Sequence, residues 1–123
     1  MPVSWGELID KVTILEIKQQ RLASESARAN AARELALLQA VAGPRCEAAE
    51  LAAVKDQLKA VNEQLWEIED RIRNKEAAAS FDADFIELAR SVYKRNDERA
   101  AIKRRINKLL SSELVEEKSY STY

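Results

Sequence analysis

The chain has 123 residues, 20 basic and 21 acidic side chains and a formal net charge of −1. One domain is expected, and overall charge gives no attraction to nucleic acid or anionic membranes. Histidine is absent, which excludes Ser-His and Cys-His nucleophiles and removes the most common metal ligand. Only 2 glycines and 2 prolines interrupt a composition rich in Ala, Leu, Glu, Lys and Arg, so the fold is predicted to be all-α.

The first predicted helix covers about residues 4–41 and opens with a capping box, Ser4 followed by Glu7. One apolar stripe runs along it with Gln19 in its middle, and a second apolar set lies off that stripe: Ile9, Ile14 and Ile17. A helix that is apolar on more than one face needs more than one neighbour, which could be the other two helices, the C-terminal tail or a second copy of the chain. The small, polar segment 24–33 leaves open whether the helix bends or its seam changes partner.

The second predicted helix covers about residues 45–79 and carries the clearest pattern in the chain. Its apolar residues alternate steps of three and four, as in a heptad seam. The residues of this seam are Leu51, Val54, Leu58, Val61, Leu65, Ile68 and Ile72. Trp66 lies one position off the seam, where an aromatic residue of the core is favoured over one that stacks on a ligand.

The third predicted helix covers about residues 82–112, with Ser80 or Asp82 as its cap. At 100° per residue, the centre of its apolar face turns by roughly 80° between its two halves. Asn96 and Arg99 lie where the two stripes meet. Residues 113–123 are short and polar and are predicted to form a tail.

Three long helices with short connections predict an antiparallel up-down-up bundle with coiled-coil character. Taking the turns as centres, facing positions add to about 87 for the first two helices and to about 160 for the last two. This register places Gln19, Glu63, Asn96 and Arg99 near one height. A buried polar layer of this kind most often sets the register of a bundle, and it otherwise serves a ligand or a partner.

Charged motifs suggest other functions, with less support. The pairs Glu7 with Asp10 and Glu67 with Asp70 resemble the Mg²⁺-binding carboxylates of all-α nucleotide pyrophosphohydrolases. In the predicted register the two pairs lie ~15 Å apart, too far for one metal cluster. The basic run 90–108 faces acidic residues of the second helix, which favours ion pairs over a nucleic-acid surface.

The first helix also faintly resembles that of all-α chorismate mutases, in which cations surround a dicarboxylate substrate. That resemblance would assign Lys11, Lys18 and Arg21 to substrate binding. The uninterrupted second helix and the unmatched cations farther along the chain count against it.

Four stretches carry a resemblance over nearly the whole chain: VSWGELIDKVTILEIK, LWEIEDRIRNKE, FIELARSVYKRND and LVEEKSY. Together they resemble a family of small all-helical bacterial proteins of unknown function. The resemblance implies an association with surface-carbohydrate enzymes such as glycosyltransferases, and it brings no catalytic residue. Because these stretches coincide with the polar layer, the surface around Trp66, Tyr93, Asn96 and Asp97 is the best candidate for a site.

Two hypotheses follow. The first is a non-enzymatic interaction module, cytoplasmic and dimeric, that binds a partner protein and needs no cofactor or metal. It depends on the surplus apolar faces of the first helix and on the heptad seam. The second is a small-molecule or anion-binding protein that uses the polar layer, including Gln19, Glu63, Asn96, Asp97 and Arg99. No nucleic-acid partner or membrane-spanning segment is expected.

Overall fold

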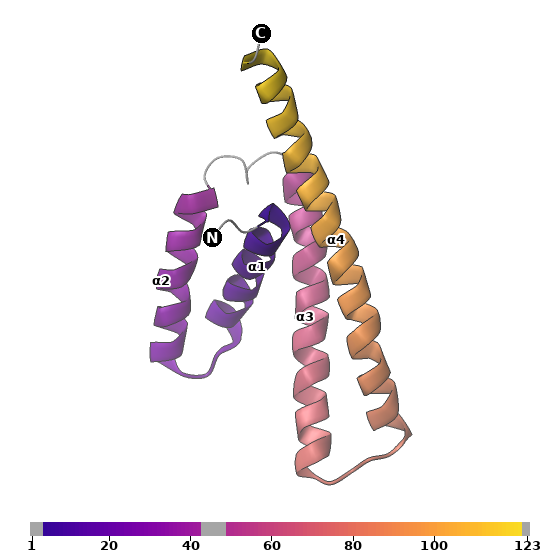
Figure 1. The fold of residues 1–123 in the computed structure, drawn as a ribbon. Helices are drawn as coiled ribbons and strands as arrows, with labels where there is room; N and C mark the ends of the chain where they lie inside the picture. Colours follow the sequence, from indigo (N-terminus) through magenta and orange to yellow (C-terminus); the bar gives the residue numbers. More distant parts are fainter. Residues whose placement is uncertain (1–3, 43–48, 122–123) are drawn as a thin grey trace.

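The computed structural model describes the backbone of residues 4–42 and 49–121 and the side chains of residues 4–41 and 50–110. Over these residues the chain forms four helices, α1 (Trp5–Arg21), α2 (Glu25–Ala42), α3 (Ala49–Ala77) and α4 (Ala83–Ser121). Helices α3 and α4 form a long antiparallel hairpin, and α1 and α2 form a shorter hairpin beside one end of it (Figure 1). The all-α prediction is confirmed, whereas the prediction of three helices is wrong.

The first predicted helix divides in two because the chain turns between α1 and α2. Leu22 leaves the helical region, with φ −66° and ψ 137°, and the Ser24 hydroxyl accepts a hydrogen bond from the Ala27 backbone N–H at 3.3 Å. The Arg28 side chain donates to the carbonyl oxygens of Leu22 and Ala23 at 2.7 and 3.0 Å. These bonds satisfy backbone groups that the helix ends would otherwise leave unpaired. At the other end of α1, Ser4 caps the helix as predicted.

Helix α1 buries different faces against α2 and against the α3–α4 hairpin. Val12 and Leu15 pack with residues of α2, and Ile9 enters the main core. The other buried members of that core are Leu51, Leu58, Val61, Leu65, Ile102, Ile106 and Leu110. Among the described residues, α2 packs on α1 alone (Figure 1). The two apolar faces of α1 therefore have the two neighbours that their pattern requires.

The α3–α4 hairpin has the register expected from the sequence. Arg95 Nη1 lies 3.5 Å from Gln64 Oε1, within one residue of the predicted pairing. At the tip, Ala79 adopts the left-handed conformation with φ 52°, which reverses the chain after α3. The Asp82 carboxylate then caps α4 by accepting a hydrogen bond from the Phe85 N–H at 3.0 Å, as predicted.

The inward face of α4 is continuous, so the predicted turn of roughly 80° is wrong. One series of buried and half-buried positions keeps steps of three and four along the whole described length of the helix: Phe85, Leu88, Val92, Arg95, Arg99, Ile102, Ile106 and Leu109. Two arginines therefore occupy the seam itself. Their long side chains carry the charges out of it, Arg95 toward Glu98 at 2.7 Å and Arg99 toward α1.

Two predicted boundaries also change. Helix α4 continues to Ser121, whereas the sequence placed its end near residue 112 and a tail at 113–123. Residues 113–121 contain no glycine or proline, so nothing in their backbone chemistry ends the helix. The start predicted for the second helix, at residue 45, lies outside the described residues. No helix over the described ranges is long and apolar enough to span a membrane.

Candidate functional site

A buried carboxylate lies where α1, α3 and α4 meet. The residue Asp10 is 3% exposed, and its neighbours Thr13 and Asn62 are 0% and 5% exposed. Asn62 Nδ2 donates to Asp10 Oδ1 at 2.9 Å and to Thr13 Oγ1 at 2.8 Å. The Thr13 hydroxyl donates in turn to the Asp10 backbone carbonyl at 2.7 Å. The three side chains form one hydrogen-bonded unit between α1 and α3.

Arg99 completes this unit from α4. Its Nε donates to Asp10 Oδ1 at 2.9 Å, and its Nη2 contacts Asp10 Oδ2. This two-point geometry is the strong form of an arginine–carboxylate pair. The hydrogen bond that Arg99 donates to the Asp10 carboxylate raises the pKa of Arg99 above its ordinary value, against the opposing effect of burial.

The unit links the two hairpins at a fixed height. A carboxylate taken out of water is tolerated only when its oxygens are paired, and Asp10 accepts hydrogen bonds from both Asn62 and Arg99. Over the described side chains, no buried nitrogen or oxygen lacks a partner. A shift of α1 along the α3–α4 hairpin would break these bonds, so we interpret the unit as setting the position of α1.

The start of α1 lies against the later part of α4. Gly6 N–H donates to Asn107 Oδ1 at 2.6 Å, and Lys103 Nζ lies 2.6 Å from Glu7 Oε1. A Cβ atom at position 6 would lie 2.6 Å from the Lys103 carbonyl oxygen. Glycine therefore permits the close approach of the two backbones.

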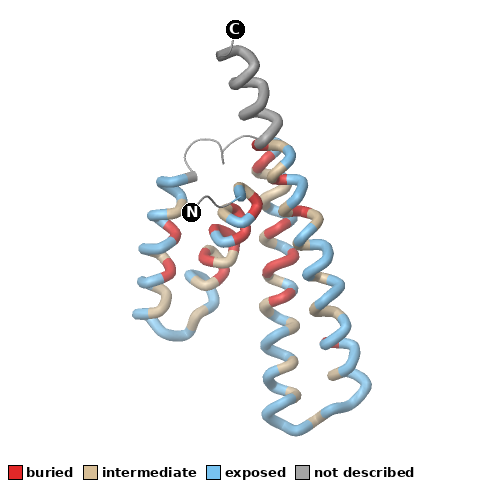
Figure 2. Tube along the Cα trace, in the orientation of Figure 1, coloured by how far each residue is buried: buried red, intermediate tan, exposed pale blue. Residues whose placement is uncertain are grey.

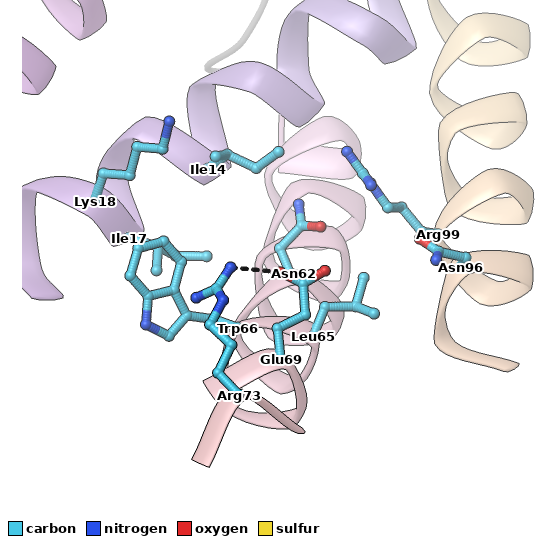
Figure 3. Close-up of a pocket in the computed structure, with 10 residues that line it drawn as sticks. All are labelled: Ile14, Ile17, Lys18, Asn62, Leu65, Trp66, Glu69, Arg73, Asn96 and Arg99. Atoms are coloured by element: carbon cyan, nitrogen blue, oxygen red, sulfur yellow. Dashed lines mark ion pairs between the residues drawn. The ribbon is translucent and has the colours of Figure 1, made fainter. Parts of the chain in front are cut away.

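Beside the buried unit lies a cleft of about 370 Å³ between the end of α1 and the α3–α4 hairpin (Figure 3). Its apolar walls come from Ile14 and Ile17 of α1 and from Leu65 and Trp66 of α3. Small-molecule sites commonly have volumes of about 300–1,000 Å³ and mostly apolar walls with a few polar groups. The cleft therefore has the size of a site for one small molecule.

The polar wall of the cleft carries an excess of positive charge. Lys18, Arg73 and Arg99 contribute cations, Asn96 an amide and Glu69 one carboxylate. Arg73 pairs with Glu69 at 3.8 Å (Figure 3), and Arg99 pairs with Asp10. Over the described residues the side chain of Lys18 has no ion-pair or hydrogen-bond partner. One cationic side chain is thus available to a ligand without breaking a contact of the protein.

The structure brings three of the seven predicted site residues to this cleft: Trp66, Asn96 and Arg99. The other four do not line it: Gln19, Glu63, Tyr93 and Asp97. Tyr93 is 65% exposed, and Glu63 faces Arg21 at 4.0 Å. The sequence register places Arg99 level with Glu63, whereas in the structure Arg99 pairs with Asp10, because the break after α1 brings Asp10 to that height.

Sequence reasoning missed Asp10, Thr13 and Asn62 as one unit. In the sequence Asp10 stands out only by its spacing from Glu7, and Asn62 follows Val61 of the heptad seam. Polar residues commonly flank a heptad seam, so this position by itself does not distinguish a contact with a third helix from exposure to solvent. Without the position of α1, it also does not identify the partner.

Most side chains that the two weaker enzyme hypotheses would use form ion pairs within the protein instead. Glu7 and Asp10 pair with Lys103 and Arg99, and no group of three metal-binding side chains occurs in the described parts of the chain. The carboxylates proposed as the second pair, Glu67 and Asp70, lie 3.3 Å from Arg21 and Arg73, respectively. The chorismate mutase residues separate, since Lys11 pairs with Glu34 at 3.5 Å while Lys18 lines the cleft.

Comparison with known proteins identifies a family. The model of a family described as a family of unknown function, DUF6165, matches residues 1–123. No curated protein and no solved structure matches the chain.

Proposed function

Because the chain belongs to this family of unknown function, we propose its function from the cleft: it is a non-enzymatic protein that binds the anionic group of a small molecule between α1, α3 and α4. The observation that carries the proposal is that Lys18, whose side chain is unpaired over the described residues, lines the same cleft as Arg99, whose guanidinium is oriented by a buried carboxylate.

Arg99 is suited to bind an anion because its orientation is already set. Its Nε and Nη2 are engaged by Asp10, and among the described residues nothing accepts a hydrogen bond from Nη1. A guanidinium held on one side loses little freedom when its other side binds a ligand. The Asp10 carboxylate thus orients Arg99, which lines the cleft, and leaves Nη1 as a donor.

Lys18 supplies the charge that the buried unit lacks. The positive charge of Arg99 is balanced by Asp10, and that of Arg73 by Glu69. An added anion therefore interacts mainly with Lys18 as a net charge, and with Arg99 and Asn96 as hydrogen-bond donors. Because the cleft is partly enclosed by apolar side chains, this attraction is screened less than one at an open surface.

Titration with inorganic phosphate tests this proposal. We expect fast-exchange shifts of the amide and side-chain NMR signals of residues that line the cleft. The Lys18→Gln variant should weaken binding about tenfold, since it removes the unpaired cation. Lys11→Gln is the matched control, because Lys11 is also on α1 but pairs with Glu34 away from the cleft. Equal loss in both variants, or no shifts at the cleft, would contradict the proposal.

A helical interaction module is the second candidate, and the exposed apolar side chains of the α3–α4 hairpin favour it. Phe81, Ile86 and Tyr93 are 58%, 57% and 65% exposed. The second apolar face of α1 does not favour this candidate, because Ile9 and Ile17 are buried within one chain and the half-buried Ile14 lines the cleft. Assembly with a second copy, a link to surface-carbohydrate enzymes and a cytoplasmic location stay predictions.

Light scattering with the Ile86→Glu variant tests the interaction module. A wild-type dimer that becomes a monomer in the variant, with unchanged helical circular dichroism, is the expected result. A monomeric wild type would remove self-association from the proposal. Copurification of a glycosyltransferase with the wild type and not with the variant would instead support a partner protein.

A further inference from the structure

One acceptor in the cleft is left unused by the protein. Asn62 Nδ2 donates one hydrogen bond to Asp10 and one to Thr13. Because the Asp10 carboxylate can only accept, the orientation of the Asn62 amide is determined. Over the described residues no group donates a hydrogen bond to Asn62 Oδ1. Every fully buried side-chain oxygen in that part of the chain has a hydrogen-bond partner, so an oxygen without a partner is not fully buried. Oδ1 is therefore accessible, and Asn62 lines the cleft. This oxygen can accept a hydrogen bond from a ligand.

The apolar part of the cleft has a flat aromatic surface. Trp66 is half-buried on the side of α3 that faces α1, and Ile17 lies beside it (Figure 3). Ile14 and Leu65 add aliphatic surface. Aromatic rings stack on indole more favourably than aliphatic groups do, because both faces are flat and polarizable. A ring is the apolar body that best fits these walls.

These features narrow the class of ligand for the proposed anion site, and the inference rests on that site. We infer that the cleft takes a small aromatic anion, a single-ring carboxylate or phosphate that carries a hydrogen-bond donor on its ring. The anionic group is bound by Lys18 and Arg99, the ring lies against Trp66, and the donor binds Asn62 Oδ1. A volume of about 370 Å³ suits one ring with its substituents.

A matched series of probes tests the three parts of the ligand separately. Inorganic phosphate and acetate supply the anion alone, phenyl phosphate and benzoate add the ring, and 4-aminobenzoate adds a ring donor. Aniline has the ring and donor without the anion. Affinities are measured by NMR titration, with the indole N–H signal of Trp66 as a reporter. The two Trp signals are assigned with the Trp66→Leu variant.

Phenyl phosphate is expected to bind at least about tenfold more tightly than inorganic phosphate, as stacking on an aromatic side chain predicts. We expect 4-aminobenzoate to exceed benzoate by about threefold or more, the range of one neutral hydrogen bond. The better of phenyl phosphate and benzoate identifies the anion that the cleft prefers.

The Trp66→Leu variant separates stacking from charge. It should lower the affinity for phenyl phosphate about tenfold and leave that for inorganic phosphate unchanged. Tyr93→Leu is the matched control, because Tyr93 is an exposed aromatic residue that does not line the cleft. Circular dichroism and the melting temperature confirm that each variant is folded.

The outcomes distinguish this inference from the proposed function. If inorganic phosphate binds as tightly as phenyl phosphate, the aromatic class is wrong and the anion site remains. Aniline binding as tightly as 4-aminobenzoate would overturn the anion site itself. If none of the probes shifts the signals of the cleft, both are wrong.

Discussion

The α3–α4 hairpin has two parts that share one heptad pattern but differ in burial (Figure 2). In the part beside α1, Leu58 and Ile106 are fully buried. Toward the turn, Ile72 and Phe85 hold equivalent seam positions but are only half-buried. The difference is α1, which covers one part and ends before the other. A heptad pattern therefore identifies which side chains face a partner helix, whereas the number of neighbouring helices determines how fully those side chains are buried.

The cleft lies at the boundary between these two parts, where α1 ends. Ile14 and Lys18 belong to the last turns of α1, while Arg73 belongs to the part of α3 that α1 leaves uncovered. A third helix that continued would fill this space. The same break that ends α1 thus creates the candidate site.

The largest effect is expected from removing the carboxylate that links the hairpins. Asp10→Ala leaves Arg99, whose side chain is 28% exposed, and the buried Asn62 without their partner, and breaking a buried pair in this way typically costs about 3–5 kcal/mol. Urea unfolding measures the loss. Glu98→Ala is the control, because Glu98 pairs with Arg95 near the surface and should cost less than about 1 kcal/mol. Equal losses would mean that the buried unit does not position α1.

Truncation of seam residues compares the two parts directly. Ile106→Ala removes a side chain that is 0% exposed and should destabilise the protein by about 3–4 kcal/mol. Ile72→Ala removes a half-buried one, and we expect about 1 kcal/mol, because less apolar surface and a smaller cavity are involved. Similar free energies of unfolding for the two variants would show that the distal seam is covered in solution.

A methyl group at the contact of α1 with α4 should have a smaller effect. In Gly6→Ala the added Cβ would lie 2.6 Å from the Lys103 carbonyl oxygen, and a backbone atom cannot move away as a side chain can. Overpacking costs about 1–3 kcal/mol, which exceeds the gain of about 1 kcal/mol from the helix propensity of alanine. A lower melting temperature is expected, and an unchanged or higher one would contradict the close approach.

The smallest effect is expected at the distal turn and depends on pH. The hydrogen bond from Lys75, with one from the Phe85 N–H, lowers the pKa of Asp82 from 3.8 to about 2. A lowered pKa stabilises the fold above the unfolded value, and this contribution is lost as pH falls from 3.8 toward 2. The stability advantage of wild type over Asp82→Asn should therefore shrink between pH 4 and pH 2 in urea unfolding. A difference in free energy of unfolding that stays constant from pH 4 to pH 2 would contradict a stabilising role for the charge of Asp82.

Part of the candidate site could be found from the sequence. Arg99 and Asn96 were recognised as polar residues in or beside an apolar seam, and Trp66 as an aromatic residue beside one. Asp10 and Asn62 could not be matched, because the predicted continuous first helix would place Asp10 near Ala77, at the other end of α3. Their pairing depends on where α1 ends and where it crosses the hairpin. The spacing of residues within one helix does not predict either position.

The amino-acid sequence by itself determined the helical class, the heptad seam of α3, the caps at Ser4 and Asp82 and the register of the α3–α4 hairpin. These features depend on local spacing and on a short turn, so they can be read from neighbouring residues. Tertiary structure decided the break after α1, the antiparallel contact of α1 with α4 and the burial of Asp10. A carboxylate can be buried only where Asn62 and Arg99, far apart in sequence, both reach it, and that condition exists only in the assembled fold.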